Sequence, residues 1–257
     1  MKKISLVLLA CAGFVLNTQA AANYAAKVIS YDPGAGFAAG FTNGQSVLGE
    51  PSRVAPFGEA IDPFNPPYGT NQITSIGAGG SITIKFHKPV FNVARKPFGL
   101  DFILFGNAGF IVTNEFSLET FTYIGTPATD GSLFAHNMGV TRVSVSANGR
   151  KFYMLDPEST SIVDALFPTD ASGRFDLPVD PALTQQDFAG ATLQEIRALY
   201  HGSAGGTGFN ISNARTERGH RVHLPWIRYV RVEVIEGKAE IDAFSAVGRH
   251  LPRHTKD

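Results

Sequence analysis

The chain has 257 residues, of which 44% are hydrophobic and 17% are charged, and this globular composition excludes intrinsic disorder, collagen and coiled coil. Its 22 basic and 22 acidic residues balance, which argues against a nucleic-acid-binding protein. With 27 Gly, 15 Pro and 20 Phe residues, the composition favours many short strands joined by turns over a helical bundle.

Residues 1–21 have the pattern of a secretory signal peptide. Lys2 and Lys3 give a positive start, residues 4–16 are apolar, and small residues follow at Ala20. This apolar stretch is shorter than the roughly 20 residues that span a bilayer, and no later apolar run is long enough. We therefore expect cleavage near residues 20–22 and a secreted, periplasmic or cell-surface protein without a transmembrane span.

Cys11, the one cysteine of the chain, leaves a second interpretation open. The segment from Leu8 to Cys11 partly resembles a bacterial lipobox, which would leave this cysteine lipidated at the mature N-terminus. The apolar stretch continues past the cysteine to Leu16, which favours plain cleavage. The mature chain then has no cysteine, and its stability depends on its hydrophobic core without a disulfide.

Two segments in the first half are predicted strands of different kinds. Residues 81–86 alternate between apolar and polar side chains, the pattern of a half-buried antiparallel strand, and Pro89 is expected to end it. Residues 100–105 are apolar on both faces. This second strand is therefore predicted to be central and covered on both sides.

Two hairpins are predicted in the second half. Asn148-Gly149 lies between alternating runs over residues 143–155, which indicates a tight turn with positive φ angles. Residues 227–234 form another predicted strand, and a turn at residues 236–238 leads into residues 239–247. We expect these last two strands to form a closing hairpin.

One helix is predicted between the hairpins. Thr192 and Glu195 fit a capping box, three apolar residues follow on one stripe, and Gly202 is a C-terminal stop. Much of the preceding chain is rich in Pro, Asp, Ser and Thr, so residues 156–225 are predicted to form a long loop and helix excursion at the surface.

The elements together predict one all-β domain over residues 22–247. Two facing sheets hide the apolar sides of half-buried strands, so we expect a jelly-roll-type antiparallel β-sandwich with long loop insertions and one or two short helices. Residues 248–257 are basic and are expected to form a flexible tail.

Six segments of the sequence carry a resemblance to a known family: Val47–Pro51, Ser75–Ile84, Leu100–Asn107, Val143–Phe152, Ile227–Val232 and Glu240–Phe244. Together they resemble a family of secreted bacterial cell-surface proteins with a galactose-binding-like or discoidin-like β-sandwich and no settled activity. The chain departs from that pattern in its basic tail, which replaces an apolar sorting helix, and at Gly106, where relatives often carry an acid.

Asp101 and Asp242 stand out because each lies in an apolar strand, where a buried carboxylate needs a partner. The resemblance implies a structural calcium near the closing strand. Ca²⁺ takes about six to eight oxygen ligands, and Asp101, Asn107 and Asp242 could supply several. Alternatively, both carboxylates accept hydrogen bonds from loop amides or pair with arginine, and the missing acid at Gly106 weakens the metal interpretation.

Four aromatic residues are candidate ligand contacts: Phe64, Tyr68, Phe110 and Tyr123. They lie in Pro- or Gly-rich segments that are predicted to be loops, where the binding residues of a sandwich tend to lie. Because aromatic rings can stack on sugar faces, they predict a glycan contact surface.

No catalytic motif is strong enough to name a reaction, since there is no Gly-x-Ser-x-Gly elbow and no cysteine in the mature chain. The prediction is a non-catalytic envelope module that recognises a glycan or another surface protein. The alternative is a secreted, glycosidase-like hydrolase with a carboxylate pair such as Glu115 and Glu119. A calcium-stabilised scaffold without a small ligand is a third interpretation.

Overall fold

The structure is a computed structural model that describes residues 23–134, 139–155 and 167–248. The predicted signal peptide, Cys11, residues 156–166 of the excursion and nearly all of the basic tail lie outside the described residues. The described chain is an all-β sandwich with antiparallel sheets and one α-helix, which confirms the predicted fold class. Its jelly-roll connectivity stays a prediction.

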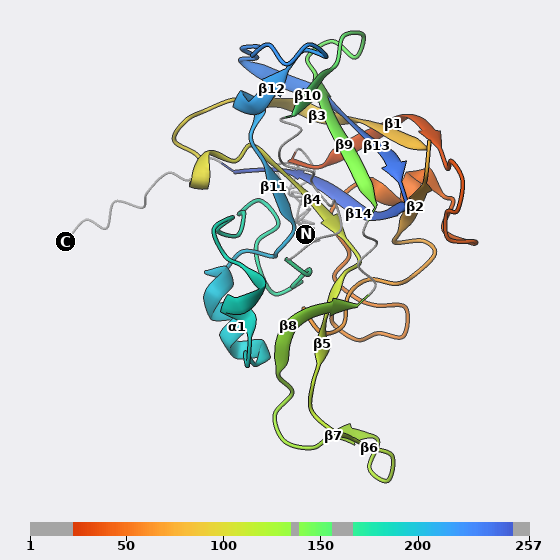
Figure 1. Ribbon diagram of the computed structural model, residues 1–257, viewed down its shortest axis with the longest axis vertical. Helices are drawn as coiled ribbons and strands as arrows, with labels where there is room; N and C mark the ends of the chain where they lie inside the picture. The colour runs from red at the N-terminus through yellow and green to blue at the C-terminus, as the bar shows by residue number, and fades with distance from the viewer. Residues whose placement is uncertain (1–22, 135–138, 156–166, 249–257) are drawn as a thin grey trace, which may run out of the picture.

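The first sheet has six strands in the order β1-β3-β13-β9-β10-β12 (Figure 1). Their bounds are Ala25–Asp32, Ser81–Phe91, Trp226–Glu236, Val140–Ser146, Tyr153–Leu155 and Ala214–Arg215. The second sheet has the order β11-β4-β14-β2, with bounds Thr207–Phe209, Phe102–Gly106, Lys238–Ala246 and Thr74–Gly77. Apart from the neighbours β9 and β10, the paired strands of these two sheets are distant in sequence.

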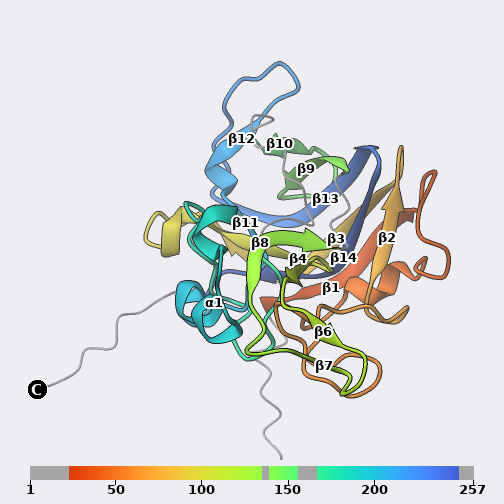
Figure 2. The same cartoon turned by 60° about the horizontal axis from the view of Figure 1, so that its bottom comes forward.

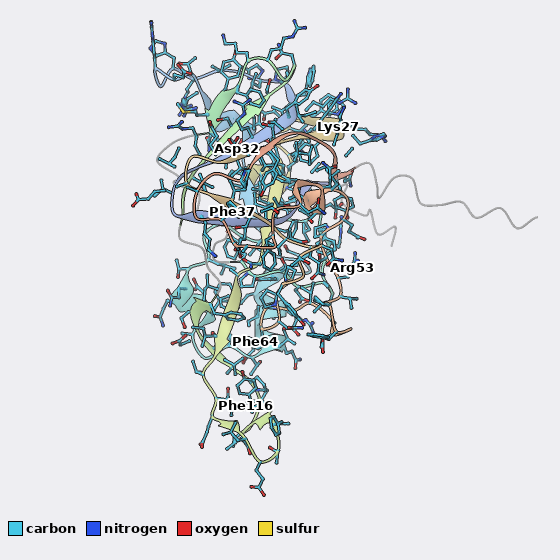
Figure 3. The ribbon with its side chains drawn as sticks, turned by 90° about the vertical axis from the view of Figure 1, so that its right-hand side faces the viewer. Lys27, Asp32, Phe37, Arg53, Phe64 and Phe116 are labelled. Atoms are coloured by element: carbon cyan, nitrogen blue, oxygen red, sulfur yellow. The ribbon has the colours of Figure 1, made fainter. Side chains whose placement is uncertain are left out.

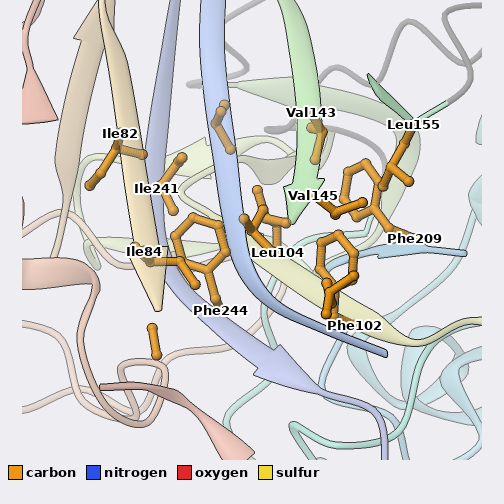
Figure 4. Packing of buried hydrophobic residues seen from close by; sticks show 14 of the residues in the cluster. Ile82, Ile84, Phe102, Leu104, Val143, Val145, Leu155, Phe209, Ile241 and Phe244 are labelled. Atoms are coloured by element: carbon orange, nitrogen blue, oxygen red, sulfur yellow. The ribbon is translucent and has the colours of Figure 1, made fainter. Parts of the chain in front are cut away.

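The main hydrophobic core lies between the two sheets (Figure 4). Ile82 and Val145 point into it from the first sheet, and Leu104 and Phe244 from the second; all four are buried. The alternation predicted over residues 81–86 is confirmed, because the apolar side chains of that stretch all enter this cluster.

Strand β4 is the central, doubly covered strand that its sequence predicts. Phe102 faces the main core, whereas Ile103 and Phe105 belong to a second cluster outside the sheet. The ring of Phe105 meets that of Phe175 edge-on, with centroids 5.4 Å apart. The excursion therefore covers the outer face of the second sheet, and it also contributes the edge strands β11 and β12.

Two details of the strand predictions are wrong. Strand β3 does not end at Pro89 but runs to Phe91. Its register with β13 shifts between Ile227 and Tyr229, and Pro89 lies opposite this irregular stretch. The proline therefore does not have to donate a ladder hydrogen bond there. Strands β9 and β10 do pair, and Gly149 has the expected positive φ of 74°, but residues 147–152 connect the strands in place of a tight turn.

The predicted closing hairpin is also wrong. After β13 the chain turns at Gly237, whose φ is 70°, and β14 joins the other sheet between β4 and β2. Residues 239–245 are all buried, so this strand requires cover on both faces and fits the middle of the second sheet better than a sheet edge.

The helix α1 spans Leu193–Tyr200 and confirms its prediction. The N–H of Thr192 donates to Glu195 Oε2 at 2.8 Å, and Ile196 and Tyr200 are buried. The described residues also form the short 3₁₀ helices η2 Gly44–Val47, η3 Pro97–Gly99, η4 Gln185–Phe188 and η5 Ile211–Asn213. Over the described residues, no helix combines the length and hydrophobicity needed to traverse a bilayer.

A two-stranded arm, residues 109–134, projects from the sandwich (Figures 1 and 2). Its base is the pair β5 Gly109–Val112 and β8 Thr129–Phe134, and its end is the pair β6 Phe116–Ser117 and β7 Thr122–Tyr123. Figure 3 shows Phe64 near the root of the arm and Phe116 farther out along it.

Candidate ligand cavity

A cavity of about 710 Å³ lies where three segments meet: the loop of residues 60–67, the arm, and the start of α1. Binding sites for small ligands have volumes of roughly 300–1,000 Å³, and they combine apolar walls with a few fixed polar groups. Two other clefts, of about 500 and 400 Å³, are lined mainly by small or charged residues, and only one residue of the second, Phe152, is aromatic.

The loop wall is held rigidly. Asp62 Oδ1 accepts hydrogen bonds from the backbone N–H groups of Phe64 and Asn65, at 2.8 and 3.1 Å. The N–H of Phe110 donates to Pro63 O at 2.7 Å, which ties this loop to the base of the arm. Burial raises the pKa of the Asp62 carboxyl above its ordinary value, although the two N–H groups oppose that shift.

The arm wall depends on Asn114. Its Nδ2 donates to the carbonyl oxygens of Ile124 and Thr126 at 3.0 and 3.1 Å, and its Oδ1 accepts from the N–H of Ala128 at 2.8 Å. This amide thus joins the two sides of the arm beside the cavity. Tyr123, which lines the cavity, packs edge-on against Phe116 with centroids 5.2 Å apart.

The helix wall presents Gln194 and Arg197. Arg197 Nε lies 2.7 Å from Asp170 Oδ2, and its Nη2 lies 3.2 Å from Oδ1 of the same carboxylate. The Asp170 side chain is 1% exposed and the Arg197 side chain 42%. Ser172 adds hydrogen bonds from its N–H and hydroxyl to Asp170. The guanidinium is therefore fixed from behind while it faces the cavity.

Charge in the cavity is low. Among the described residues that line it, Asp62 is the one carboxylate and Arg197 the one guanidinium. The charge of Arg197 is already compensated by Asp170. The site therefore suits a neutral ligand with hydroxyl groups better than an anion.

The four predicted aromatic contacts separate into three locations. Phe64 and Tyr123 line the cavity. Tyr68 lies outside its lining, 40% exposed, with its ring centroid 6.3 Å from that of Phe57. The prediction for Phe110 is wrong, because this residue lies in strand β5 and not in a loop. Its ring is buried, with its centroid 4.9 Å from that of Phe188. A ring without exposed surface cannot stack on a sugar.

Asp242 has protein partners for both carboxylate oxygens. The N–H of Ser52 donates to Oδ2 at 2.8 Å, and the Ser52 hydroxyl donates to Oδ1 at 2.7 Å. Burial raises the pKa of this carboxyl to about 7, although both Ser52 bonds lower it. The prediction that a loop amide satisfies this aspartate agrees with the geometry.

Asp101 has different partners. Lys96 Nζ lies 3.1 Å from Oδ1 in a buried ion pair, and the N–H of Ile211 donates to Oδ2 at 2.9 Å. Burial raises the pKa of Asp101, opposed chiefly by the Lys96 charge. Asn107 Nδ2 donates to Glu240 Oε2 at 2.6 Å.

The three residues predicted to bind calcium do not form one site. Asp101 lies beside Val247, whereas Asp242 lies five residues earlier in β14, in the irregularity between Ile241 and Ala243. The two aspartates are therefore about 15 Å apart along the strands at ~3.3 Å per residue. The Lys96 ammonium beside Asp101 also disfavours a cation there. Throughout the described ranges, no group of three or more His, Cys, Asp or Glu side chains could hold a metal ion. Calcium binding itself stays a prediction.

Sequence reasoning missed Asp62, Asn65 and Arg197 as cavity residues. The spacing of Asp62 and Asn65 around Pro63 is typical of a turn capped by a carboxylate, and this signal was present in the sequence. Glu115 and Glu119, the carboxylates suggested for hydrolysis, are exposed on the arm and do not line the cavity.

No protein-family model matches this sequence, and no curated protein matches it significantly. Function must therefore be argued from the site itself.

Proposed function

We propose that the protein is a non-catalytic, exported recognition module that binds a neutral glycan in the cavity at the root of the arm. The observation that carries the proposal is the lining itself, in which the rings of Phe64 and Tyr123 stand beside Asp62, Asn65 and Gln194. Sugar rings offer apolar faces to aromatic side chains and hydroxyl groups to carboxylates and amides, so this combination fits both parts of a carbohydrate.

The walls support recognition because they are held in place before a ligand arrives. The hydrogen bonds of Asp62, Asn114 and Asp170 fix the loop, the arm and the guanidinium of Arg197 respectively. A pre-formed site loses little conformational entropy on binding, which favours affinity for a ligand of modest size.

A hydrolytic role has less support. Glycosidases place two carboxyl groups about 5–9.5 Å apart around the bond that they cleave. Of the described residues lining this cavity, only Asp62 carries a carboxyl group, and the nearby Asp170 is held in an ion pair with Arg197. The export pattern of residues 1–21 and the resemblance to secreted cell-surface proteins support a location outside the cytoplasm.

Binding of the mature protein to an array of neutral and uronate-containing oligosaccharides tests the proposal. We expect neutral oligosaccharides to bind and uronate-containing ones to bind more weakly. Tyr123→Ala and Gln194→Ala should each weaken binding of the best oligosaccharide by about tenfold, which is the effect of losing about 1.4 kcal/mol. Tyr68→Ala is the matched control, because it removes an aromatic residue of similar exposure outside the cavity.

Two results would contradict the proposal. One is binding that Tyr68→Ala weakens as much as Tyr123→Ala does. The other is cleavage of an oligosaccharide that Asp62→Asn abolishes, which would favour the hydrolase alternative.

A further inference from the structure

The tip of the arm exposes apolar side chains to an unusual degree. Leu118 is 77% exposed, Phe121 76%, Ile124 56% and Phe116 44%. All four lie on or beside the small β6–β7 hairpin, which stands well away from the sandwich (Figure 3). Large apolar side chains that are exposed together in one small region mark a contact surface.

These side chains surround the hairpin and do not form one face. Phe116 pairs with Tyr123 across the two strands, so their side chains share a face. Ile124 follows Tyr123 and points to the opposite face, and Leu118 and Phe121 occupy the connecting loop. A protein groove covers one face of a hairpin, whereas a bilayer surrounds an inserted tip on all sides.

Phe121 adds a second, independent observation. Its φ is 53°, in the left-handed region, where Gly and Asn are favoured in a hairpin loop of this kind. A large apolar residue in this conformation at an exposed position is costly both to the backbone and to solvation. Strain of this sort is concentrated at functional surfaces.

We propose that the tip of the arm inserts the side chains of Phe116, Leu118, Phe121 and Ile124 into the surface of a lipid bilayer. A stable protein interface needs about 20–30 residues on each side, and the tip offers four large apolar ones. A few exposed aromatic and aliphatic side chains are enough for reversible attachment to a bilayer, since binding strength follows the apolar area buried. This contact is additional to the cavity and does not depend on glycan binding.

The charges of the arm define which bilayer it contacts. Glu115 precedes the apolar tip, Glu119 lies in its loop between Leu118 and Phe121, and residues 97–141 contain no Lys or Arg. The carboxylates stay at headgroup level, which keeps insertion shallow, and they are repelled by anionic lipids. The tip therefore prefers a zwitterionic surface, and its binding there is insensitive to salt.

Flotation of the mature protein with glycan-free phosphatidylcholine vesicles tests this inference. We expect the protein to float with the vesicles, and the double variant Leu118→Ser/Phe121→Ser to lower its partition coefficient at least tenfold. Phe57→Ser is the matched control, because Phe57 is 83% exposed but lies on the sandwich, off the arm. Vesicles with one-third phosphatidylserine should bind less protein at low salt.

Three results would overturn the inference. The first is that the protein does not bind phosphatidylcholine vesicles. The second is that Phe57→Ser lowers the partition coefficient as much as Leu118→Ser/Phe121→Ser does. The third is that the protein binds the anionic vesicles more strongly than the phosphatidylcholine vesicles. If the wild-type protein instead sediments as a dimer that Leu118→Ser/Phe121→Ser dissociates, the tip is a protein interface. Oligosaccharide binding in solution, measured on the same double variant, separates this outcome from failure of the proposed function, because the cavity should be unaffected.

Discussion

Asp242 couples the stability of the sandwich to pH, and Asp242→Asn removes that coupling. Its carboxyl is buried in strand β14 and contacts Ser52, and its pKa rises from the ordinary 3.8 to about 7 because burial disfavours the charged form. Asparagine has the shape of the protonated acid. Its Oδ1 can accept from the Ser52 N–H while its Nδ2 donates to the Ser52 hydroxyl.

The magnitude follows from the difference between folded and unfolded pKa values. The folded chain holds this proton more tightly, so between about pH 4 and pH 7 it binds more protons than the unfolded chain, and the free energy of unfolding falls as pH rises. One pKa unit corresponds to about 1.4 kcal/mol, so the full effect above pH 7 is at most about 4 kcal/mol. We expect Asp242→Asn to be more stable than wild type by about 2–4 kcal/mol at pH 8, and nearly equal to it at pH 4.

Urea unfolding of both proteins at several pH values between 4 and 8 measures this difference. Glu217→Gln is a suitable control, because Glu217 is exposed and its removal changes the net charge by the same amount. A variant that is less stable than wild type at pH 8, or a difference that does not change with pH, would refute the reasoning. A loss of stability seen only with calcium present would indicate instead that Asp242 binds the ion.

Three further experiments test other parts of the structure. Lys96→Met should destabilise the fold by about 3 kcal/mol, because it removes the ammonium that pairs with the buried Asp101 carboxylate. Adding Asp101→Asn to this variant should recover part of the lost stability. Urea unfolding measures both effects. Thr192→Ala should cost about 1 kcal/mol by removing the cap of α1, seen as a lower melting temperature. Phe110→Leu should lower stability by about 1–2 kcal/mol yet leave oligosaccharide affinity unchanged, because its ring is buried; a selective loss of affinity would refute this.

Local patterns predicted the elements of the fold that depend on neighbouring residues. The alternation in β3, the doubly apolar β4 and the capping box of α1 are each defined within about ten residues, and all three are confirmed. The partner of a strand is not a local property. Strand β14 follows β13 after a single glycine, Gly237, yet it pairs in the other sheet, since only there are both of its apolar faces covered.

The site was less predictable than the fold. Phe64 and Tyr123 could be chosen because aromatic residues in turn-rich segments tend to be exposed, but the same rule selected the buried Phe110. The cavity exists because the arm and α1 lie close together, and the link from Thr129 to Ala191 that ties them spans many residues. Likewise, the pairing of Asp101 with Lys96 depends on how η3 turns back toward β4, which no spacing rule encodes.

The central claim, that the cavity at the root of the arm holds a glycan, is tested most directly by hydroxyl-radical footprinting with the tightest-binding oligosaccharide from the array. We expect the oligosaccharide to protect Phe64 and Tyr123 from oxidation, while Tyr68 and Phe57 stay as reactive as in the free protein. Protection of Tyr68 and Phe57 with unchanged reactivity at Phe64 and Tyr123 would contradict it.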